Sequence, residues 1–315
     1  MPVRPLRAAR LRLAALACGL ATTVLITACS SSDGSTSTGS SPAASNSLPT
    51  IKSGVLTVAI EPYAPYTEAK GDTMVGFDAD IINAVAARLG LKVKVEVTDF
   101  AGMLAGVQAG RYDITVGGVA WTKKRQESGL FTDPPYYSPP AMAVRSSKTY
   151  KNVQDLEGLN LGTVEGYVWV QAIQQVPGAK LHVYPDANGV LDDLAAGRID
   201  VGFLDPLIIL AAQKARPGMN VTTEYLTPPS DADVAEHPAY DYFRPYMTGF
   251  YLPKKASTLE KAISAQIRTM YSDGELTTLA KKYGADPDQF LKPSPGMASA
   301  RTAVDRPDGW APPSI

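Results

Sequence analysis

The chain has 315 residues and a formal net charge of −1, with two cysteines and two histidines. This balance excludes the extended basic surface that nucleic-acid binding requires. His182 and His237 lie far apart in the sequence and have no cysteine partners, so no zinc site is expected. We predict that the protein uses no metal and no other cofactor.

The N-terminal segment has the pattern of an export signal. Four arginines come before the apolar stretch 13–28, and residues 1–28 contain no acidic residue. The apolar stretch is shorter than the roughly 20 residues that a membrane-spanning helix needs. Ile26-Thr27-Ala28-Cys29 resembles the bacterial lipobox, whose cysteine becomes the lipidated first residue of the mature chain. We therefore predict a signal peptide over 1–28 and a lipid anchor on Cys29, which attaches the exported protein to the outer face of the cell membrane. A buried cysteine in a core helix is the alternative.

Loss of residues 1–28 would change the charge and the cysteine content of the chain. It would remove four positive charges and no negative ones, so the net charge would move from −1 to −5. Cys29 would be the only cysteine left, which excludes an internal disulfide and leaves a hydrophobic core to hold the fold. Residues 29–50 are mostly small and polar, which is typical of a flexible tether.

Strands and helices are expected to alternate from residue 55 onward. Val55–Ile60 is a β-branched apolar run and predicts a buried strand. Asp78 offers an N-cap to a helix whose apolar spacing ends at Gly90. Leu91–Val97 alternates apolar and charged residues, which favours a strand, and a second helix is predicted over Phe100–Val107. This order is typical of an α/β layer structure.

A short sequence echo predicts either two similarly built lobes or only a shared local motif. The stretch 109–114 (Ala-Gly-Arg-Tyr-Asp-Ile) is matched by 196–201 (Ala-Gly-Arg-Ile-Asp-Val), and each opens an apolar strand. If two lobes exist, residues 117–125 and Asp205 follow the carboxyl ends of strands and would line a cleft. We expect 141–145 and 248–252 to be the two strands that cross between the lobes.

Several ordered motifs resemble those of one protein family. Over residues 51 to about 291 the chain is similar to the amino-acid-type (family 3) extracellular solute-binding proteins of ABC importers. The motifs that carry this resemblance are Gly76-Phe77-Asp78-Ala79-Asp80-Ile81, Thr122-Lys123-Lys124-Arg125-Gln126, Phe131-Thr132-Asp133-Pro134, Ser272-Asp273-Gly274-Glu275-Leu276 and Lys281-Lys282-Tyr283-Gly284.

The resemblance implies a particular fold. We expect an α/β protein with the two-lobe periplasmic-binding-protein-like fold (type II), its lobes joined by two crossing strands. The expected lobes are 51–143 with 248–292, and 144–247, followed by a Pro-rich tail over 293–315. Residues 217–245 exceed the family's usual connection and are interpreted as a surface excursion of the second lobe.

An α-amino acid needs a cation for its carboxylate, an anion for its ammonium group and a surface for its side chain. Arg125 suits the carboxylate because a guanidinium can form two parallel hydrogen bonds with it. The alternative is that Arg125 belongs to a solvated Lys-Lys-Arg run. Asp205 suits the ammonium group because it ends an apolar strand, although it could instead cap the helix that starts at Pro206.

The resemblance adds further candidate ligand residues. Tyr63 and Phe100 match positions where the family stacks aromatic rings on the ligand, although either could be ordinary core. Gly118 and Ala120 stand where many relatives carry hydroxyl side chains, and Val168 stands where relatives often carry threonine. These departures leave backbone N–H groups as the donors. Trp121 and Trp169 lie beside the matched loops and have no assigned role.

Three functions compete at this point. The leading one is a receptor, not an enzyme, that delivers an amino acid or close analogue to the permease subunits of an ABC transporter. An exported dehydratase that acts on a prephenate-like acid would share the fold, with Glu61 or Glu165 as its general acid or base. The third is a ligand-sensing module without an importer.

Overall fold

The computed structural model describes residues 48–295, 297 and 306–315. The predicted signal peptide, Cys29 and most of the tether lie outside these residues. No helix within the described ranges is both long enough and apolar enough to span a membrane.

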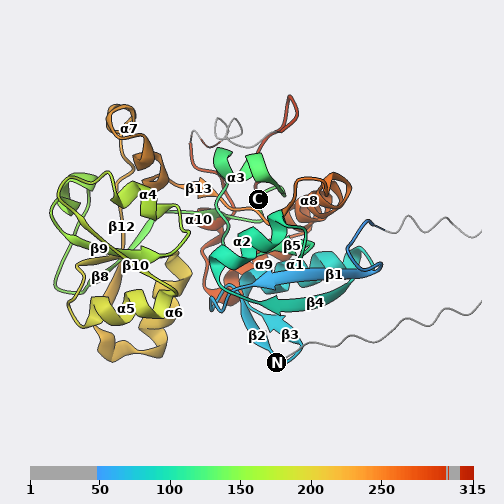
Figure 1. Ribbon diagram of the computed structural model, residues 1–315, viewed down its shortest axis with the longest axis horizontal. Helices are drawn as coiled ribbons and strands as arrows, with labels where there is room; N and C mark the ends of the chain where they lie inside the picture. Colours follow the sequence, from blue (N-terminus) through green and yellow to red (C-terminus); the bar gives the residue numbers. More distant parts are fainter. Residues whose placement is uncertain (1–47, 296, 298–305) are drawn as a thin grey trace, which may run out of the picture. The chain divides into compact units, whose positions relative to one another are not determined.

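The first lobe is built on a five-stranded sheet in the order β4-β1-β5-β14-β6. The strand predicted from the apolar run is β1, and it pairs in parallel with β4 and β5, whereas β14 runs antiparallel to β5 and β6. The strands are β1 (Val55–Ile60), β4 (Lys92–Val97), β5 (Ile114–Thr115), β14 (Tyr251–Pro253) and β6 (Gly129–Phe131), and a hairpin of β2 (Glu68–Lys70) and β3 (Thr73–Val75) follows β1. Its helices are α1 (Phe77–Arg88), α2 (Phe100–Gln108), α3 (Lys123–Ser128), α8 (Ser257–Ser272), α9 (Glu275–Tyr283) and α10 (Pro287–Phe290) (Figure 1).

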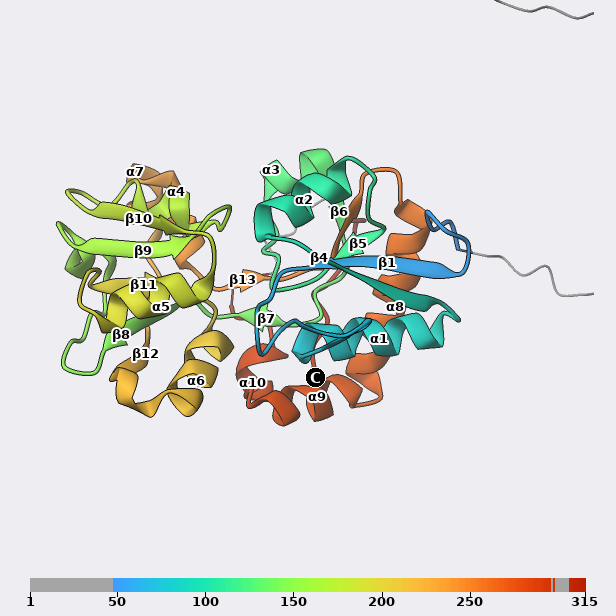
Figure 2. The ribbon, with the colours of Figure 1, turned by 60° about the horizontal axis from the view of Figure 1, so that its bottom comes forward.

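The second lobe has a sheet of the same design, in the order β10-β9-β11-β8-β12. Its strands are β8 (Ala141–Arg145), β9 (Asn160–Val164), β10 (Lys180–Tyr184), β11 (Val201–Phe203) and β12 (Val221–Tyr225). Its helical segments are η1 (Val153–Leu156), α4 (Trp169–Ile173), α5 (Ala187–Ala195), α6 (Pro206–Ala215), η2 (Pro217–Met219), α7 (Asp231–Glu236) and η3 (Pro238–Phe243) (Figure 2).

The sequence echo corresponds to equivalent positions in the two sheets. Strand β5 pairs in parallel with β1 and antiparallel with β14, and β11 likewise pairs in parallel with β9 and antiparallel with β8. The aspartate before each strand also plays the same part, since Asp113 accepts the Thr57 N–H (2.8 Å) and Asp200 accepts the Asn160 N–H (3.0 Å). The interpretation as two similarly built lobes is therefore correct.

The crossing strands lie a few residues earlier in the chain than predicted. Residues 141–145 form β8 inside the second sheet, and 251–253 form β14 inside the first. The segments that pair between the sheets are β7 (Tyr137–Ser138) and β13 (Tyr246–Met247), which lie side by side between the lobes in Figure 2. The apolar runs that suggested crossing strands are buried strands of the two sheets, because burial and not crossing selects such residues.

The first helix ends as predicted but does not begin as predicted. Gly90 follows its last residues with φ 69°, a left-handed conformation that suits glycine. The N-cap is Gly76 and not Asp78. The buried Asp78 carboxylate instead accepts the N–H groups of Gly117 (2.7 Å) and Gly118 (2.9 Å), so it holds the loop after β5.

The segment 217–245 is more than a surface excursion. It contributes the edge strand β12 to the second sheet, where β12 pairs with β8 along five residues. The turns that follow bury Tyr240 and Phe243 against the core of this lobe. It then leads directly into β13, which places Tyr246 at the boundary between the lobes.

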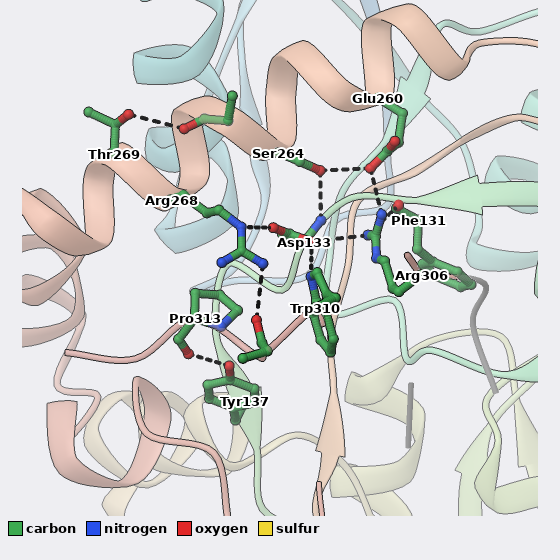
Figure 3. Close-up of polar contacts among 12 residues, drawn as sticks. Phe131, Asp133, Tyr137, Glu260, Ser264, Arg268, Thr269, Arg306, Trp310 and Pro313 are labelled. Atoms are coloured by element: carbon green, nitrogen blue, oxygen red, sulfur yellow. Dashed lines mark hydrogen bonds and ion pairs between the residues drawn. The ribbon is translucent and has the colours of Figure 1, made fainter. Parts of the chain in front are cut away.

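The last described residues, 306–315, pack on the first lobe (Figure 3). Arg306 donates to Glu260 (2.9 Å) of α8 and to the Phe131 carbonyl (2.7 Å). The Trp310 indole N–H donates to Asp133 (2.9 Å), and the Tyr137 hydroxyl donates to the Pro313 carbonyl. This part of the predicted tail therefore links α8, β6 and the crossing strand β7.

Candidate functional site

A small cavity is lined by residues from both lobes. Most of the lining follows the carboxyl end of β4, β5, β9 or β11, and Tyr246 comes from β13. Six of the seven residues that the sequence suggested as ligand contacts line it: Phe100, Gly118, Ala120, Arg125, Val168 and Asp205. The seventh, Tyr63, is not part of the lining, but its hydroxyl donates to Asp205 (2.7 Å).

Arg125 is held in the cavity wall by both lobes. It lies in α3, whose N-cap Thr122 side chain accepts the Arg125 N–H (3.1 Å). Its Nη1 donates to the Ala120 carbonyl (2.8 Å) and its Nη2 to the Gly166 carbonyl (3.0 Å) of the second lobe. Burial lowers the pKa of Arg125 to about 10, which leaves it charged at neutral pH. Lys123 and Lys124 are exposed. The alternative prediction of a solvated Lys-Lys-Arg run therefore holds for these two lysines alone.

Asp205 lines the same cavity from the second lobe and accepts hydrogen bonds from hydroxyl groups. Tyr63 donates to Oδ2, and Ser138 (3.0 Å) and Tyr246 donate to Oδ1. Asp205 is the N-cap residue of α6, but its side chain makes no capping bond, so the capping interpretation does not apply to the carboxylate. Burial raises the pKa of Asp205. None of the ion pairs among the described residues includes it.

Some backbone N–H groups of the cavity lining already donate hydrogen bonds within the protein, and others do not. The N–H groups of Gly117 and Gly118 are engaged by Asp78. The N–H groups of Ala120 and Val168 make no hydrogen bond with any other part of the chain that the structure describes. Together with the Arg125 guanidinium, these two N–H groups are hydrogen-bond donors that line the cavity.

Aromatic rings form the rest of the wall. The centroid of Phe100 lies 4.9 Å from that of Tyr167, which lies 6.0 Å from Trp169, which in turn lies 6.2 Å from Tyr246. All four line the cavity, and the Arg125 guanidinium carbon lies 5.3 Å from the Phe100 centroid. We call Phe100, Tyr167, Trp169 and Tyr246 the aromatic wall.

The sequence did not single out Tyr167, Tyr246 or Asp78 for these places. Tyr167 precedes Val168, so its position next to a matched loop was the available signal. Tyr246 follows the long segment 217–245, and its place depends on how that segment folds. Trp121, by contrast, lies outside the cavity and packs against Trp310 (5.6 Å between centroids).

Two acids considered for catalysis lie away from the cavity lining. Glu61 is buried, accepts the Tyr167 hydroxyl (2.9 Å) across the lobes, and has its pKa raised by burial to about 8. Glu165 is exposed. Within the described ranges no cluster of three His, Cys, Asp or Glu side chains could hold a metal ion.

The chain belongs to the bacterial extracellular solute-binding proteins, family 3, whose family model matches residues 56–286. The lysine/arginine/ornithine-binding periplasmic protein of Escherichia coli (strain K12) is 28% identical over 230 residues, which cover 70% of this chain and 84% of that protein. The chain therefore has the two-lobe fold that the sequence motifs predicted.

Solved structures of this family have the same fold. An ancestral arginine-binding protein bound to arginine matches with a TM-score of 0.64 and 26% identity, covering 73% of this chain and 98% of that one. An ancestral amino-acid-binding protein, described as a precursor of cyclohexadienyl dehydratase, matches with a TM-score of 0.61 and 23% identity, covering 73% and 95%. The fold alone therefore does not separate binding proteins from enzymes.

Proposed function

We propose that the protein is the receptor of an ABC importer and captures an amino acid or close analogue between its two lobes. One arrangement carries this proposal: Arg125 of the first lobe, two free N–H groups and the Asp205 carboxyl group of the second lobe line one cavity. Such a pair matches the opposite charges of an amino acid, and the relatives named for amino-acid binding support the same ligand class.

Capture of the ligand would stabilise the closed arrangement of the lobes. Arg125 and Tyr63 of the first lobe already contact Gly166 and Asp205 of the second. A ligand that contacts both lobes shifts the population toward the closed form through its differential contacts. Small-angle scattering should then show a smaller radius of gyration at saturating ligand, and an unchanged radius would contradict closure.

The direct test is a thermal-shift screen with amino acids, their N-methylated derivatives, polyamines and small carboxylates. A ligand present at about 100 times its Kd should stabilise the folded protein by about 2.7 kcal/mol. If no compound in the screen raises the melting temperature, the receptor proposal fails.

Binding is favoured over catalysis because neither Glu61 nor Glu165 lines the cavity. A general acid or base must come within hydrogen-bond reach of the group it protonates or deprotonates. Incubation with prephenate tests the alternative, and formation of a dehydrated product would establish the enzyme.

Membrane attachment through Cys29 and transfer of the ligand to permease subunits are parts of the same proposal. They are supported by the lipobox-like tetrapeptide and by the extracellular family. Cys29→Ala should release the protein from the membrane fraction or leave the precursor uncleaved. A variant that is processed and still tightly bound to the membrane would contradict the anchor.

A further inference from the structure

The polar groups of the aromatic wall are already paired with protein atoms. The Tyr167 hydroxyl donates to Glu61, the Trp169 indole N–H donates to the Tyr242 carbonyl (3.1 Å), and the Tyr246 hydroxyl donates to Asp205. Phe100 has no polar group. The wall therefore offers a ligand ring surface and few free hydrogen-bonding groups.

Asp205 has little acceptor capacity left for a ligand. An ionised carboxylate accepts about four hydrogen bonds, and Asp205 already accepts three, from Tyr63, Ser138 and Tyr246. A primary ammonium group brings three N–H donors, so most of them would lack a partner on Asp205. Unsatisfied buried donors weaken binding.

Asp205 still attracts a cation. It is 4% exposed, and the ion pairs among the described residues leave its charge without a counter-ion. A methylated ammonium group carries a positive charge but few or no N–H donors, and aromatic faces attract such cations. The aromatic wall beside a carboxylate therefore fits a methylated cation better than a primary ammonium group.

The inference rests on the proposed function and narrows its ligand class. We propose that the cavity selects a small carboxylate whose nitrogen is quaternary or heavily N-methylated, the betaine type of amino acid. The carboxylate lies on Arg125 and the N–H groups of Ala120 and Val168. The methylated nitrogen lies against Asp205 and the aromatic wall.

The test is calorimetry with glycine, sarcosine, N,N-dimethylglycine and glycine betaine, which differ only in N-methylation. The pair of proline and N,N-dimethylproline repeats the comparison at larger size. We expect affinity to rise along the series, by about ten-fold or more between glycine and glycine betaine. The isostere 3,3-dimethylbutyrate, in which a neutral carbon replaces the charged nitrogen, should bind at least about ten-fold more weakly than glycine betaine, because it lacks the cation.

A variant separates the two parts of the inference. Tyr246→Phe keeps the ring but frees one acceptor position on Asp205. It should raise the affinity for glycine relative to that for glycine betaine, so the ratio of the two affinities should narrow several-fold. A merely structural role for Tyr246 would lower both affinities together. Lys124→Ala, an exposed residue, is the matched control and should change neither.

The outcomes also distinguish this inference from the receptor proposal. If primary amino acids bind more tightly than their N-methylated forms, the ligand class proposed here is overturned and the receptor proposal stands. If 3,3-dimethylbutyrate binds as well as glycine betaine, the role of the cation is overturned. If no amino acid or derivative in the screen binds, both proposals fail.

Discussion

Two aspartates of this protein, Asp133 and Asp205, are each 4% exposed but have opposite surroundings. Asp133 lies between two arginines: it accepts from Arg268 and lies 3.5 Å from a nitrogen of Arg306 (Figure 3). Asp205 accepts from three hydroxyl groups and takes part in none of the ion pairs among the described residues. Equal burial therefore conceals a difference in charge compensation.

That difference separates a structural carboxylate from the carboxylate that we propose binds the ligand. A buried ion pair is costly to break because the charge left behind has no solvent and no partner. Asp133, with Arg306 and Trp310, fastens the C-terminal segment to the first lobe. Asp205 lines the cavity without an ion-pair partner among the described residues, and we propose that a ligand cation supplies that partner.

The largest expected effect on stability comes from Asp133→Asn. The change removes the carboxylate that Arg268 and Arg306 share, which should lower the free energy of unfolding by about 3 kcal/mol, because Arg306 keeps its ion pair with Glu260 and Arg268 is 42% exposed. Urea denaturation measures it. Asp205→Asn is the matched variant, and it should leave the ligand-free protein as stable or more stable, because it removes an uncompensated buried charge. Equal losses in both variants would remove the distinction between the two aspartates.

The next effect is on affinity, from Arg125→Ala. Removing one partner of a desolvated charge pair costs roughly 2–5 kcal/mol, which is about 30-fold to several-thousand-fold in Kd. The ligand-free protein should lose less, because Arg125 contacts only neutral carbonyl groups and an aromatic ring there. Calorimetry with the best ligand measures the loss. Lys123→Ala should bind normally, whereas full affinity in the Arg125 variant would contradict the role that we propose for Arg125.

The effect of pH on stability is expected to be smaller for each pH unit, and it should come from Glu61. Its pKa is raised from 4.5 to about 8 by burial, so between these values the folded protein holds a proton that the unfolded chain releases. Stability should therefore fall as pH rises through this window, by about 1.4 kcal/mol per pH unit from this group. Glu61→Gln should remove that slope in urea titrations between pH 5 and 8, and an unchanged slope would assign it to other groups.

The smallest effect is expected from Trp310→Phe. This change keeps an aromatic ring next to Trp121 but removes the N–H that donates to Asp133. Asp133 keeps both arginines, so the loss should be about 1 kcal/mol. A loss as large as that of Asp133→Asn would mean that the indole, and not the arginines, compensates the carboxylate.

Local elements of this fold were predictable because neighbouring residues decide them. The strand Val55–Ile60 was placed correctly, and the stop at Gly90 was correct because a left-handed residue there favours glycine. The crossing strands were wrong by a few residues. An apolar run signals burial, and it does not say which of two sheets buries it.

The candidate site was predictable only in part. Phe100, Arg125 and Asp205 meet in one cavity because each follows a strand end or a matched motif that the sequence contains. Tyr246 was missed because it reaches the cavity only after the segment 217–245 has packed Phe243 into the second lobe. The Tyr246 hydroxyl donates a hydrogen bond to Asp205. The ligand class that we propose depends on this hydrogen bond.

The sequence by itself determined the order of strands and helices, the two-lobe family and the charged residues of the site. Only the tertiary structure decided that Asp78 holds the Gly117–Gly118 loop instead of capping its own helix. Likewise, only the tertiary structure decided that Asp133 has cations and Asp205 has none among the described residues. The reason is physical: propensity and capping act over a few residues, whereas the compensation of a buried charge depends on partners far away along the chain. Asp133 and Arg306 are 173 positions apart by residue number (306 − 133).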